Sequence, residues 1–172
     1  INLPPIINFF QEWCGNRLAK GLIRAGKNNY PFTHDLANRL IEILKDYEKD
    51  FEEICKEIFH LPSVLARFEK TGEIRKEKVL ETGLVGMAAK AGGLARDIRA
   101  SHPHDFYKEL KHVPVVKNHG DVFSRAQIRR EEVRQSIRYI RKLLEKIPEF
   151  SQTFELKNPA LDSFTISLVE GW

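Results

Sequence analysis

The chain has 172 residues, of which 42% are hydrophobic and 30% are charged. This length corresponds to one domain with a sizeable core, and the composition excludes collagen, low-complexity disorder and a disulfide scaffold. The formal net charge of +4 is too mild to indicate nucleic-acid binding by itself. No apolar stretch approaches the roughly 20 residues that span a bilayer. The first residues lack the features of a signal peptide, and we expect Cys14 and Cys55 to be reduced, as in a cytosolic protein.

Hydrophobic spacing predicts helices through the first half of the chain. An amphipathic helix is expected over Ile6–Leu22, followed by a loop over 25–32 that is rich in glycine, asparagine and proline. Thr33 is placed to cap a longer helix, whose apolar seam runs over Leu36–Ile58. Pro62 is expected to end that helix or to start a short helix through Phe68, and further short helices are expected at 76–80 and 104–110.

A second long helix is expected over about 121–147, because apolar residues recur there seven, four and three positions apart. Asp121 is placed to cap this helix and Pro148 to stop it. Short strands are expected at 113–116 and 164–168, and the second would need a partner strand. The expected fold is mostly α, a single domain over residues 1–172. It would be a helical bundle with two long antiparallel-type helices and a few short strands at the end of the chain.

Four glycines lie between residues 83 and 93, which invites comparison with phosphate-binding loops. Their order matches neither of the usual nucleotide-binding patterns, and no expected strand leads into them. We therefore expect these glycines to serve tight turns or close packing.

Side chains of metal-ligand type gather within nine positions, at Asp97, His102, His104 and Asp105. A metal site needs three or four converging ligands, so hydrogen bonding or solvent exposure is the favoured interpretation.

Nucleophilic catalysis has little support in the sequence. Both cysteines fall on apolar helix faces, where thiols are inert. The paired carboxylates Glu52–Glu53 and Glu131–Glu132 are expected on solvated faces.

The second long helix carries eight basic residues between positions 125 and 146. Acids are interleaved at ion-pairing spacing, with Glu131 near Arg134 and Glu132 near Arg129. This pattern favours a solvated or subunit-facing surface over a nucleic-acid interface.

Three stretches carry motifs that go beyond helical patterning. The first runs through Gly83-x-x-Gly86, Lys90-Ala-Gly-Gly93, Asp97-Ile-Arg99, Pro103 and Tyr107. The second runs through Gly120-Asp121-x-Phe123-x-Arg125, Arg129, Glu131-Glu132-x-Arg134-Gln135-Ser136 and Ile147-Pro148. The third combines Gly15-x-Arg17 with Arg24-x-Gly26. In this order the chain resembles the middle of the large subunit shared by energy-converting nickel–iron hydrogenases and respiratory complex I.

Within that superfamily, Arg96-Asp97-Ile98-Arg99 resembles the form found in formate hydrogenlyase-type large subunits, where complex I commonly has Trp-Asp-Leu-Arg. The segment Val169–Trp172 also resembles the lead-in to the next hydrogenase motif. The resemblance implies a central fragment of the large subunit of a membrane-associated hydrogenase that reduces protons to hydrogen. A complex I large-subunit scaffold is the alternative, and a helical interaction or nucleic-acid-binding module is a third hypothesis.

The resemblance also implies an iron–sulfur small subunit as partner, no nucleic acid and no membrane span, and a cytoplasmic position on the inner membrane face through partner subunits. The family's nickel–iron centre is held by two Cys-x-x-Cys pairs, and this chain has neither. We therefore expect no catalytic residue, no metal ligand and no cofactor in the chain, and no activity of the chain alone. Because the chain starts at Ile1, we expect a longer parent protein.

The resemblance implies that complex I relatives have a histidine at the position of Ala19, beside the iron–sulfur cluster of the neighbouring subunit. Because this chain has alanine there, we do not expect it to make that contact. Asp97 and Arg99 are expected to form a structural ion pair or to anchor the glycine-rich loop, and a direct role in proton or substrate traffic is the alternative. The positions matched to the family's motifs are expected to serve as scaffold or subunit interface: Arg17, Arg24, Asp97, Arg99, Tyr107, Asp121, Arg125 and Arg129.

Overall fold

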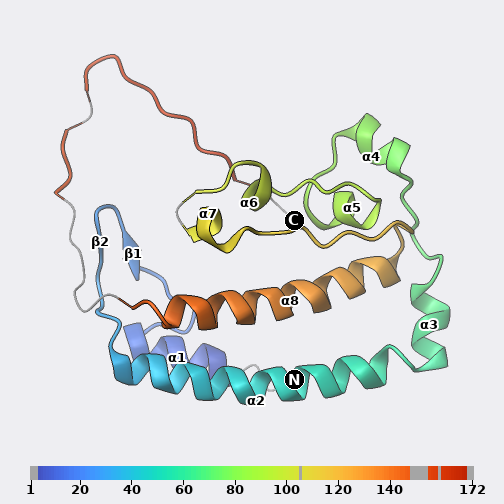
Figure 1. Cartoon of the computed structure of the whole chain (residues 1–172), viewed down its shortest axis with the longest axis horizontal. Coiled ribbons are helices and arrows are strands. Elements are labelled where there is room, and N and C mark those ends of the chain that lie inside the picture. The colour runs from blue at the N-terminus through green and yellow to red at the C-terminus, as the bar shows by residue number, and fades with distance from the viewer. Residues whose placement is uncertain (1–3, 105, 148–154, 159, 170–172) are drawn as a thin grey trace. The chain divides into compact units, whose positions relative to one another are not determined.

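The computed structural model describes residues 4–104, 106–147, 155–158 and 160–169. This part of the chain is mostly helical, as expected, with eight helices and one two-stranded antiparallel sheet (Figure 1). It divides into two compact units, Ile1–Ile54 with Ile137–Thr165 and Cys55–Ser136 with Ile166–Trp172. Two long helices contribute residues to both units, and the prediction of a single domain stays a prediction.

The first unit contains α1 (Pro4–Cys14), a hairpin of β1 (Ile23–Arg24) and β2 (Lys27–Asn28), most of α2 (His34–Ile58) and the end of α8 (Val122–Leu144). The Thr33 cap is confirmed, because the backbone N–H of Leu36 donates to the Thr33 hydroxyl at 3.2 Å. The Trp13 and Phe32 rings pack edge to face, 4.7 Å apart. Arg39 of α2 pairs with Glu12 of α1 at 3.0 Å.

The expected helix over Ile6–Leu22 is too long, because α1 ends at Cys14. Gly15 follows with a φ of +69°, the left-handed conformation that ends helices. The side-chain oxygen of Asn16 then accepts hydrogen bonds from the backbone N–H groups of Leu18 and Lys20, which replaces helical bonding by a turn.

The expected loop over 25–32 contains half of a short hairpin. Ile23 pairs with Asn28 and Arg24 with Lys27, which leaves two residues for the turn. Gly26 supplies the positive φ, +72°, that such a tight turn requires.

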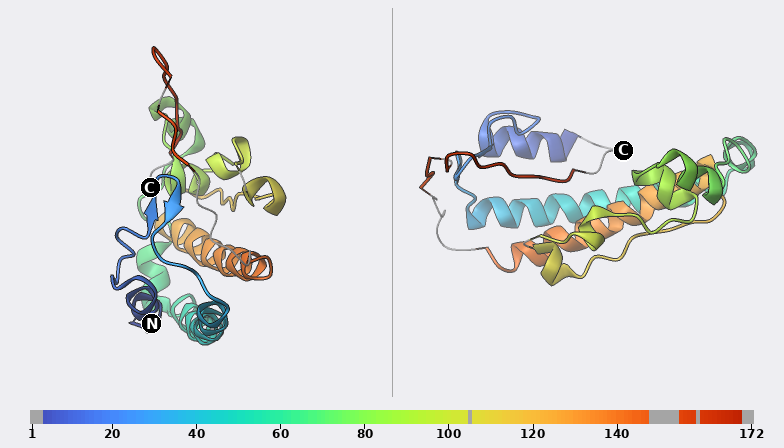
Figure 2. Two further views of the ribbon diagram at one scale, coloured as in Figure 1. Left: turned by 90° about the vertical axis from the view of Figure 1, so that its left-hand side faces the viewer. Right: turned by 90° about the horizontal axis from the view of Figure 1, so that it is seen from above.

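The second unit contains α3 (Pro62–Phe68), α4 (Lys76–Thr82), α5 (Gly86–Ala91), α6 (Ile98–Ser101), α7 (Phe106–Leu110) and the first part of α8. In Figure 1 and Figure 2, α5 and α6 lie alongside this part of α8. A small apolar core joins α5 to α8, with Met87 and Ala91 of α5 against Ile128 of α8 and Val115 packed on its side.

Close packing and left-handed turns account for the glycines, as expected. Gly83 ends α4 with a φ of +66°. A β-carbon at Gly92 would lie 2.7 Å from a methyl group of Val79. Gly120, just before α8, has a φ of +67° and touches the backbone of Ile74.

The prediction of two strands late in the chain is wrong. Neither 113–116 nor 163–169 forms a strand, and the sheet lies at 23–28 instead. A ladder needs a second strand, and the apolar side chains of Phe164, Ile166 and Leu168 are exposed in this structure. The expectations for Asp105, Pro148 and 170–172 fall outside the described residues.

Candidate functional site

Five titratable side chains from four segments meet in the second unit. We call them the ion cluster: Lys90, Asp97, Arg99, His112 and Glu132. Lys90 is 5% exposed and Asp97 is 2% exposed, so the cluster is largely removed from water. Charged groups at such depth need partners, because each pays a large desolvation cost when alone.

Asp97 occupies the middle of the cluster because it caps α6. Its Oδ1 accepts a hydrogen bond from the backbone N–H of Arg99 at 3.0 Å. The Arg99 guanidinium binds the same carboxylate through two hydrogen bonds. Nε donates to Oδ1 at 2.9 Å and Nη2 donates to Oδ2 at 2.6 Å. The ion pair expected between these two residues is confirmed.

Glu132 connects α8 to the other helices. Its Oε1 lies 2.5 Å from Nζ of Lys90 and 3.3 Å from Nη2 of Arg99. The expectation that Glu132 lies on a solvated face is wrong. Ile128, one turn before it on the same face of α8, is buried against α5, so Glu132 also faces α5. The pairing expected for its neighbour Glu131, with Arg134, is confirmed at 2.9 Å.

His112 completes the cluster from the segment after α7. Its side chain is fully buried, with Nε2 3.1 Å from Oδ2 of Asp97. The Tyr107 ring meets the imidazole edge to face, with 6.2 Å between the ring centroids, so Tyr107 adjoins the cluster.

Sequence reasoning did not identify Lys90, His112 and Glu132 as site residues. A signal for Lys90 was available, because it is a single charge among small apolar residues in Gly86–Ala91. Such a charge must find an opposite charge when the helix is buried. No comparable local signal marks His112.

The cluster shifts the acid–base behaviour of its members. Burial by itself raises the pKa of Asp97, but hydrogen bonds from Arg99 and His112 and the charge of Arg99 more than offset it. The pKa of Asp97 therefore lies well below its usual range. The hydrogen bond to Asp97, opposed by burial, raises the pKa of Arg99 above its ordinary value.

A second set of contacts anchors the start of α8, and it includes two of the residues expected as scaffold. Asp121 caps the helix as expected, with Oδ1 accepting from the Ser124 N–H at 2.7 Å, and its Oδ2 accepts from the Lys70 N–H at 3.0 Å. Burial raises the pKa of Asp121, yet these hydrogen bonds lower it overall. Arg125 donates from Nη1 to the carbonyls of Gly120 at 2.7 Å and Gly72 at 3.2 Å.

The other expected positions are exposed arginines outside the ion cluster. Arg17 lies in the turn after α1, and Arg24 lies in β1 with its guanidinium over Gly21. Arg129 lies on the solvent side of α8.

The described residues offer no group of three His, Cys, Asp or Glu side chains that could hold a metal ion. Asp97 is committed to the ion cluster, and His102 contacts the Ser101 hydroxyl at 3.0 Å. Cys14 and Cys55 are buried single thiols in different units, and the Cys14 thiol donates to the carbonyl of Phe10 at 3.2 Å. These residues do not fit a nickel–iron centre, which needs converging thiolates.

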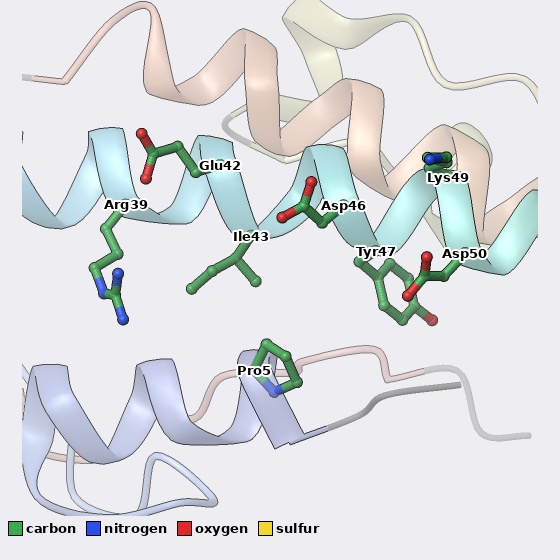
Figure 3. A pocket seen from close by; sticks show the side chains of 8 residues that line it. All are labelled: Pro5, Arg39, Glu42, Ile43, Asp46, Tyr47, Lys49 and Asp50. Atoms are coloured by element: carbon green, nitrogen blue, oxygen red, sulfur yellow. The ribbon is translucent and has the colours of Figure 1, made fainter.

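A cavity of about 450 Å³ lies in the first unit, lined by Pro5 of α1 and by seven residues of α2 (Figure 3). Arg39, Ile43 and Tyr47 point from α2 toward α1. Two cations and three carboxylates are interspersed along its α2 wall, so the cavity presents charges of both signs to a ligand.

The geometry of the ion cluster is therefore that of a structural network. Cations and carboxylates of the ion cluster are balanced two to two, and each contact joins segments that are distant in sequence or caps a helix. Within the described residues, no helix combines the length and apolar composition that crossing a membrane requires.

Comparison with known proteins identifies related chains. Residues 5–165 match the family described as respiratory-chain NADH dehydrogenase, 49 kDa subunit. An NADH-quinone oxidoreductase subunit of Akkermansia muciniphila is 28% identical over 144 residues, covering 84% of this chain and 35% of that protein. An NADH-quinone oxidoreductase subunit of Aquifex aeolicus is 31% identical over 163 residues, covering 91% of this chain and 27% of that protein.

A solved structure of the membrane-bound sulfane sulfur reductase, an archaeal respiratory membrane complex, shares the fold. The TM-score is 0.74 at 27% identity, over 91% of this chain and 42% of that chain. The chain spans about a third of the length of the curated relatives it matches. The match over 5–165 takes in both long helices and the ion cluster, and the chain therefore belongs to the family of the 49 kDa subunit of respiratory-chain NADH dehydrogenase.

Proposed function

We propose that the chain is a structural section of the large peripheral subunit of a membrane-associated oxidoreductase complex. Family membership supports this proposal, and so do the relatives, which are named as subunits of NADH-quinone oxidoreductases. In this role the chain holds helices in place and contacts partner subunits, and it carries out no redox step alone.

The observation that carries the proposal is the ion cluster. Each of its five side chains has a partner within the cluster, so its charges hold α5, α6 and α8 together. Removing one partner from such a buried set is strongly destabilising, which is the property of a scaffold.

The proposed partners are an iron–sulfur small subunit and further subunits that bind the membrane, on the cytoplasmic face. Arg17, Arg24 and Arg129 are exposed and are proposed to contact partners. The remaining scaffold positions, Asp97, Arg99, Tyr107, Asp121 and Arg125, are proposed to act inside the subunit.

The proposal is tested by isolating the tagged full-length protein from membranes of its own organism. We expect it to co-purify with an iron–sulfur protein and to leave the membrane fraction when that complex is dissociated by detergent. A protein that purifies alone, away from membranes and without iron, would contradict the proposal.

A narrower proposal places the parent in the hydrogenase branch of formate hydrogenlyase type. It rests on the order Arg96-Asp97-Ile98-Arg99. The curated relatives favour the complex I branch as the second candidate. Any nickel would be held by residues outside this chain, because the two separate thiols present here do not fit it.

Elemental analysis of the purified parent complex separates the two branches. Stoichiometric nickel together with iron is the result expected for the hydrogenase branch. A complex that lacks nickel, with iron confined to the neighbouring subunit, would move the assignment to the complex I branch.

A further inference from the structure

The segment that carries α6 and α7 is attached to the second unit in an unusual way. We call residues 95–113 the strap, of which the structure describes all but residue 105. Among the described residues of the strap, only Asp97 and His112 are buried. Its apolar side chains are exposed or half-buried, whereas α5 and α8 both bury apolar side chains. The attachment of the strap therefore depends mainly on polar contacts.

Both ends of the strap are fixed to α5 by backbone hydrogen bonds. Just before the strap, the Leu94 N–H donates to the Ala89 carbonyl at 3.0 Å. Just after it, Val115 packs on the apolar core, and the Lys117 N–H donates to the Lys90 carbonyl at 3.0 Å. The two ends are thus held by neighbouring residues of α5, so motion of the strap need not displace the rest of the chain.

Backbone hydrogen bonds around the two helices of the strap stay local. The Ser101 N–H donates to the Asp97 carbonyl at 3.0 Å, and the Tyr107 N–H donates to the His104 carbonyl at 2.9 Å. Helices α6 and α7 have only four and five residues, which is too short for a helix to stay folded once it is detached. Their hydrogen-bonded amides therefore report whether the strap is attached.

The ion cluster divides into two halves at the edge of the strap. The strap supplies Asp97, Arg99 and His112, and the framework of α5 and α8 supplies Lys90 and Glu132. Contacts inside each half are short, 2.6 Å between Arg99 and Asp97 and 2.5 Å between Lys90 and Glu132. The contacts that join the halves are longer, 3.5 Å from Lys90 to Asp97 and 3.3 Å from Arg99 to Glu132.

Detachment of the strap therefore breaks the longer ionic contacts of the cluster and keeps the short ones. The pair of Asp97 and Arg99 leaves with the strap, and the pair of Lys90 and Glu132 stays on the framework. Each charge keeps a partner of opposite sign, which avoids the large penalty of leaving a buried charge alone. A segment with few buried apolar contacts is also the kind that opens locally while the rest of a protein stays folded.

We propose that the strap opens and recloses as a unit while α5 and the first part of α8 stay folded, and that the ion cluster separates between its two halves. This motion goes beyond the proposed scaffold function and requires no partner subunit. One hydrogen bond outside the ion cluster also breaks on opening, because Gln135 of α8 donates from Nε2 to the Val113 carbonyl at 2.9 Å.

Hydrogen–deuterium exchange, measured by mass spectrometry on the full-length protein in its complex, tests the proposal. We expect the amides of α6 and α7 to exchange at least about 100-fold faster than those in the middle of α8. Their exchange should also depend less on added urea, because opening of the strap exposes less surface than unfolding of the whole unit. Equal rates and equal urea dependence for the strap and α8 would overturn the proposal.

Two variants on the same helix test whether the strap moves as a unit. Gln135→Ala removes a 2.9 Å hydrogen bond to the strap, whereas Glu131→Ala removes a 2.9 Å contact with Arg134 inside α8. We expect Gln135→Ala to raise exchange in α6 and α7 together by about fivefold, the effect of one hydrogen bond. Glu131→Ala should leave exchange in the strap within about twofold of the wild type.

Helix α6 is the informative element in this comparison, because Val113 lies at the other end of the strap in sequence. Faster exchange beside Val113 with no change in α6 would show that residues of the strap fray independently, and would overturn the proposal. Unchanged exchange in the middle of α8 checks that both variants are folded. The urea dependence of the wild type tests the proposal without any variant.

The imidazole of His112 gives a second measurement. Its side chain is fully buried, so diethyl pyrocarbonate can modify it only when the strap is open. We expect slow modification of the folded wild type, a rate that Gln135→Ala raises by the same factor as amide exchange, and no change in Glu131→Ala. A His112 that reacts only when the whole protein unfolds would contradict an opening strap.

Discussion

At the scale of single residues, the most informative side chain is Lys90. A lysine in a helix of small apolar residues would be destabilising if its ammonium group had no partner. The contacts with Glu132 and Asp97 compensate its burial, so this lysine contributes specificity to the packing of α5 on α8.

We expect Lys90→Met to lower the free energy of unfolding by about 3 kcal/mol, because the change leaves the Glu132 carboxylate half-buried with less compensation. Urea unfolding followed by circular dichroism measures this loss. The matched control is Lys78→Met, since Lys78 and Glu81 also form a Lys–Glu pair but are 60% and 68% exposed. That change should cost at most about 1 kcal/mol.

A double variant tests whether the loss comes from the pair itself. Lys90→Met with Glu132→Leu removes both charges, and we expect it to be less destabilising than the sum of the two single changes. Strict additivity would contradict a direct interaction between Lys90 and Glu132.

At the scale of secondary-structure elements, the long helices were predictable because their signals are local. The apolar seam of α2, its Thr33 cap and the Asp121 cap of α8 can all be recognised within a few residues. The first helix was predicted too long because the apolar pattern continues beyond Cys14. Gly15 and Asn16 form a turn there that ends the helix in spite of this pattern. The hairpin was missed because two-residue strands carry almost no alternation.

The turn before α8 gives a sharp test of backbone packing at this scale. Gly120 and Gly83 have nearly the same φ, +67° and +66°, but their surroundings differ. A β-carbon at Gly120 would clash with the backbone of Ile74, whereas one at Gly83 would meet nothing within 4 Å. Gly120 also donates to the Ala91 carbonyl at 2.8 Å and accepts from the Ile74 N–H at 3.2 Å.

We expect Gly83→Ala to cost about 1 kcal/mol, the penalty of a left-handed alanine. Gly120→Ala should cost roughly 3 kcal/mol, because overpacking against an unyielding backbone adds to that penalty. Thermal or urea unfolding of the two variants measures the difference. Equal losses would show that the approach of Ile74 to Gly120 adds nothing to stability.

At the scale of the whole molecule, the buried carboxylates make stability depend on pH. Folding lowers the pKa of Asp97 and of Asp121, so the unfolded chain binds their protons more readily. Their stabilisation is therefore fully present above the unfolded-state pKa of about 4 and is lost as the pH falls below it.

We expect the free energy of unfolding to be nearly constant from pH 7 to about pH 5 and to fall steeply toward pH 3. Denaturant unfolding at a series of pH values measures this profile. Asp97→Asn should lower stability at neutral pH and flatten the acid slope, and Asp121→Asn should do the same more weakly. A variant that keeps the wild-type slope would show that its carboxylate does not account for the acid loss.

The sequence by itself determined the helical class, the two long helices with their caps, the ion pair between Asp97 and Arg99, and the resemblance to the family of the 49 kDa subunit. These features depend on residues that are close in the chain or on motif order. Only the tertiary structure decided that Lys90, His112 and Glu132 join that pair, because residues up to 42 positions apart have no local signature of contact. Tertiary structure also decided where a strand forms, because a ladder requires a second strand and the alternating segment at 164–168 has none beside it among the described residues.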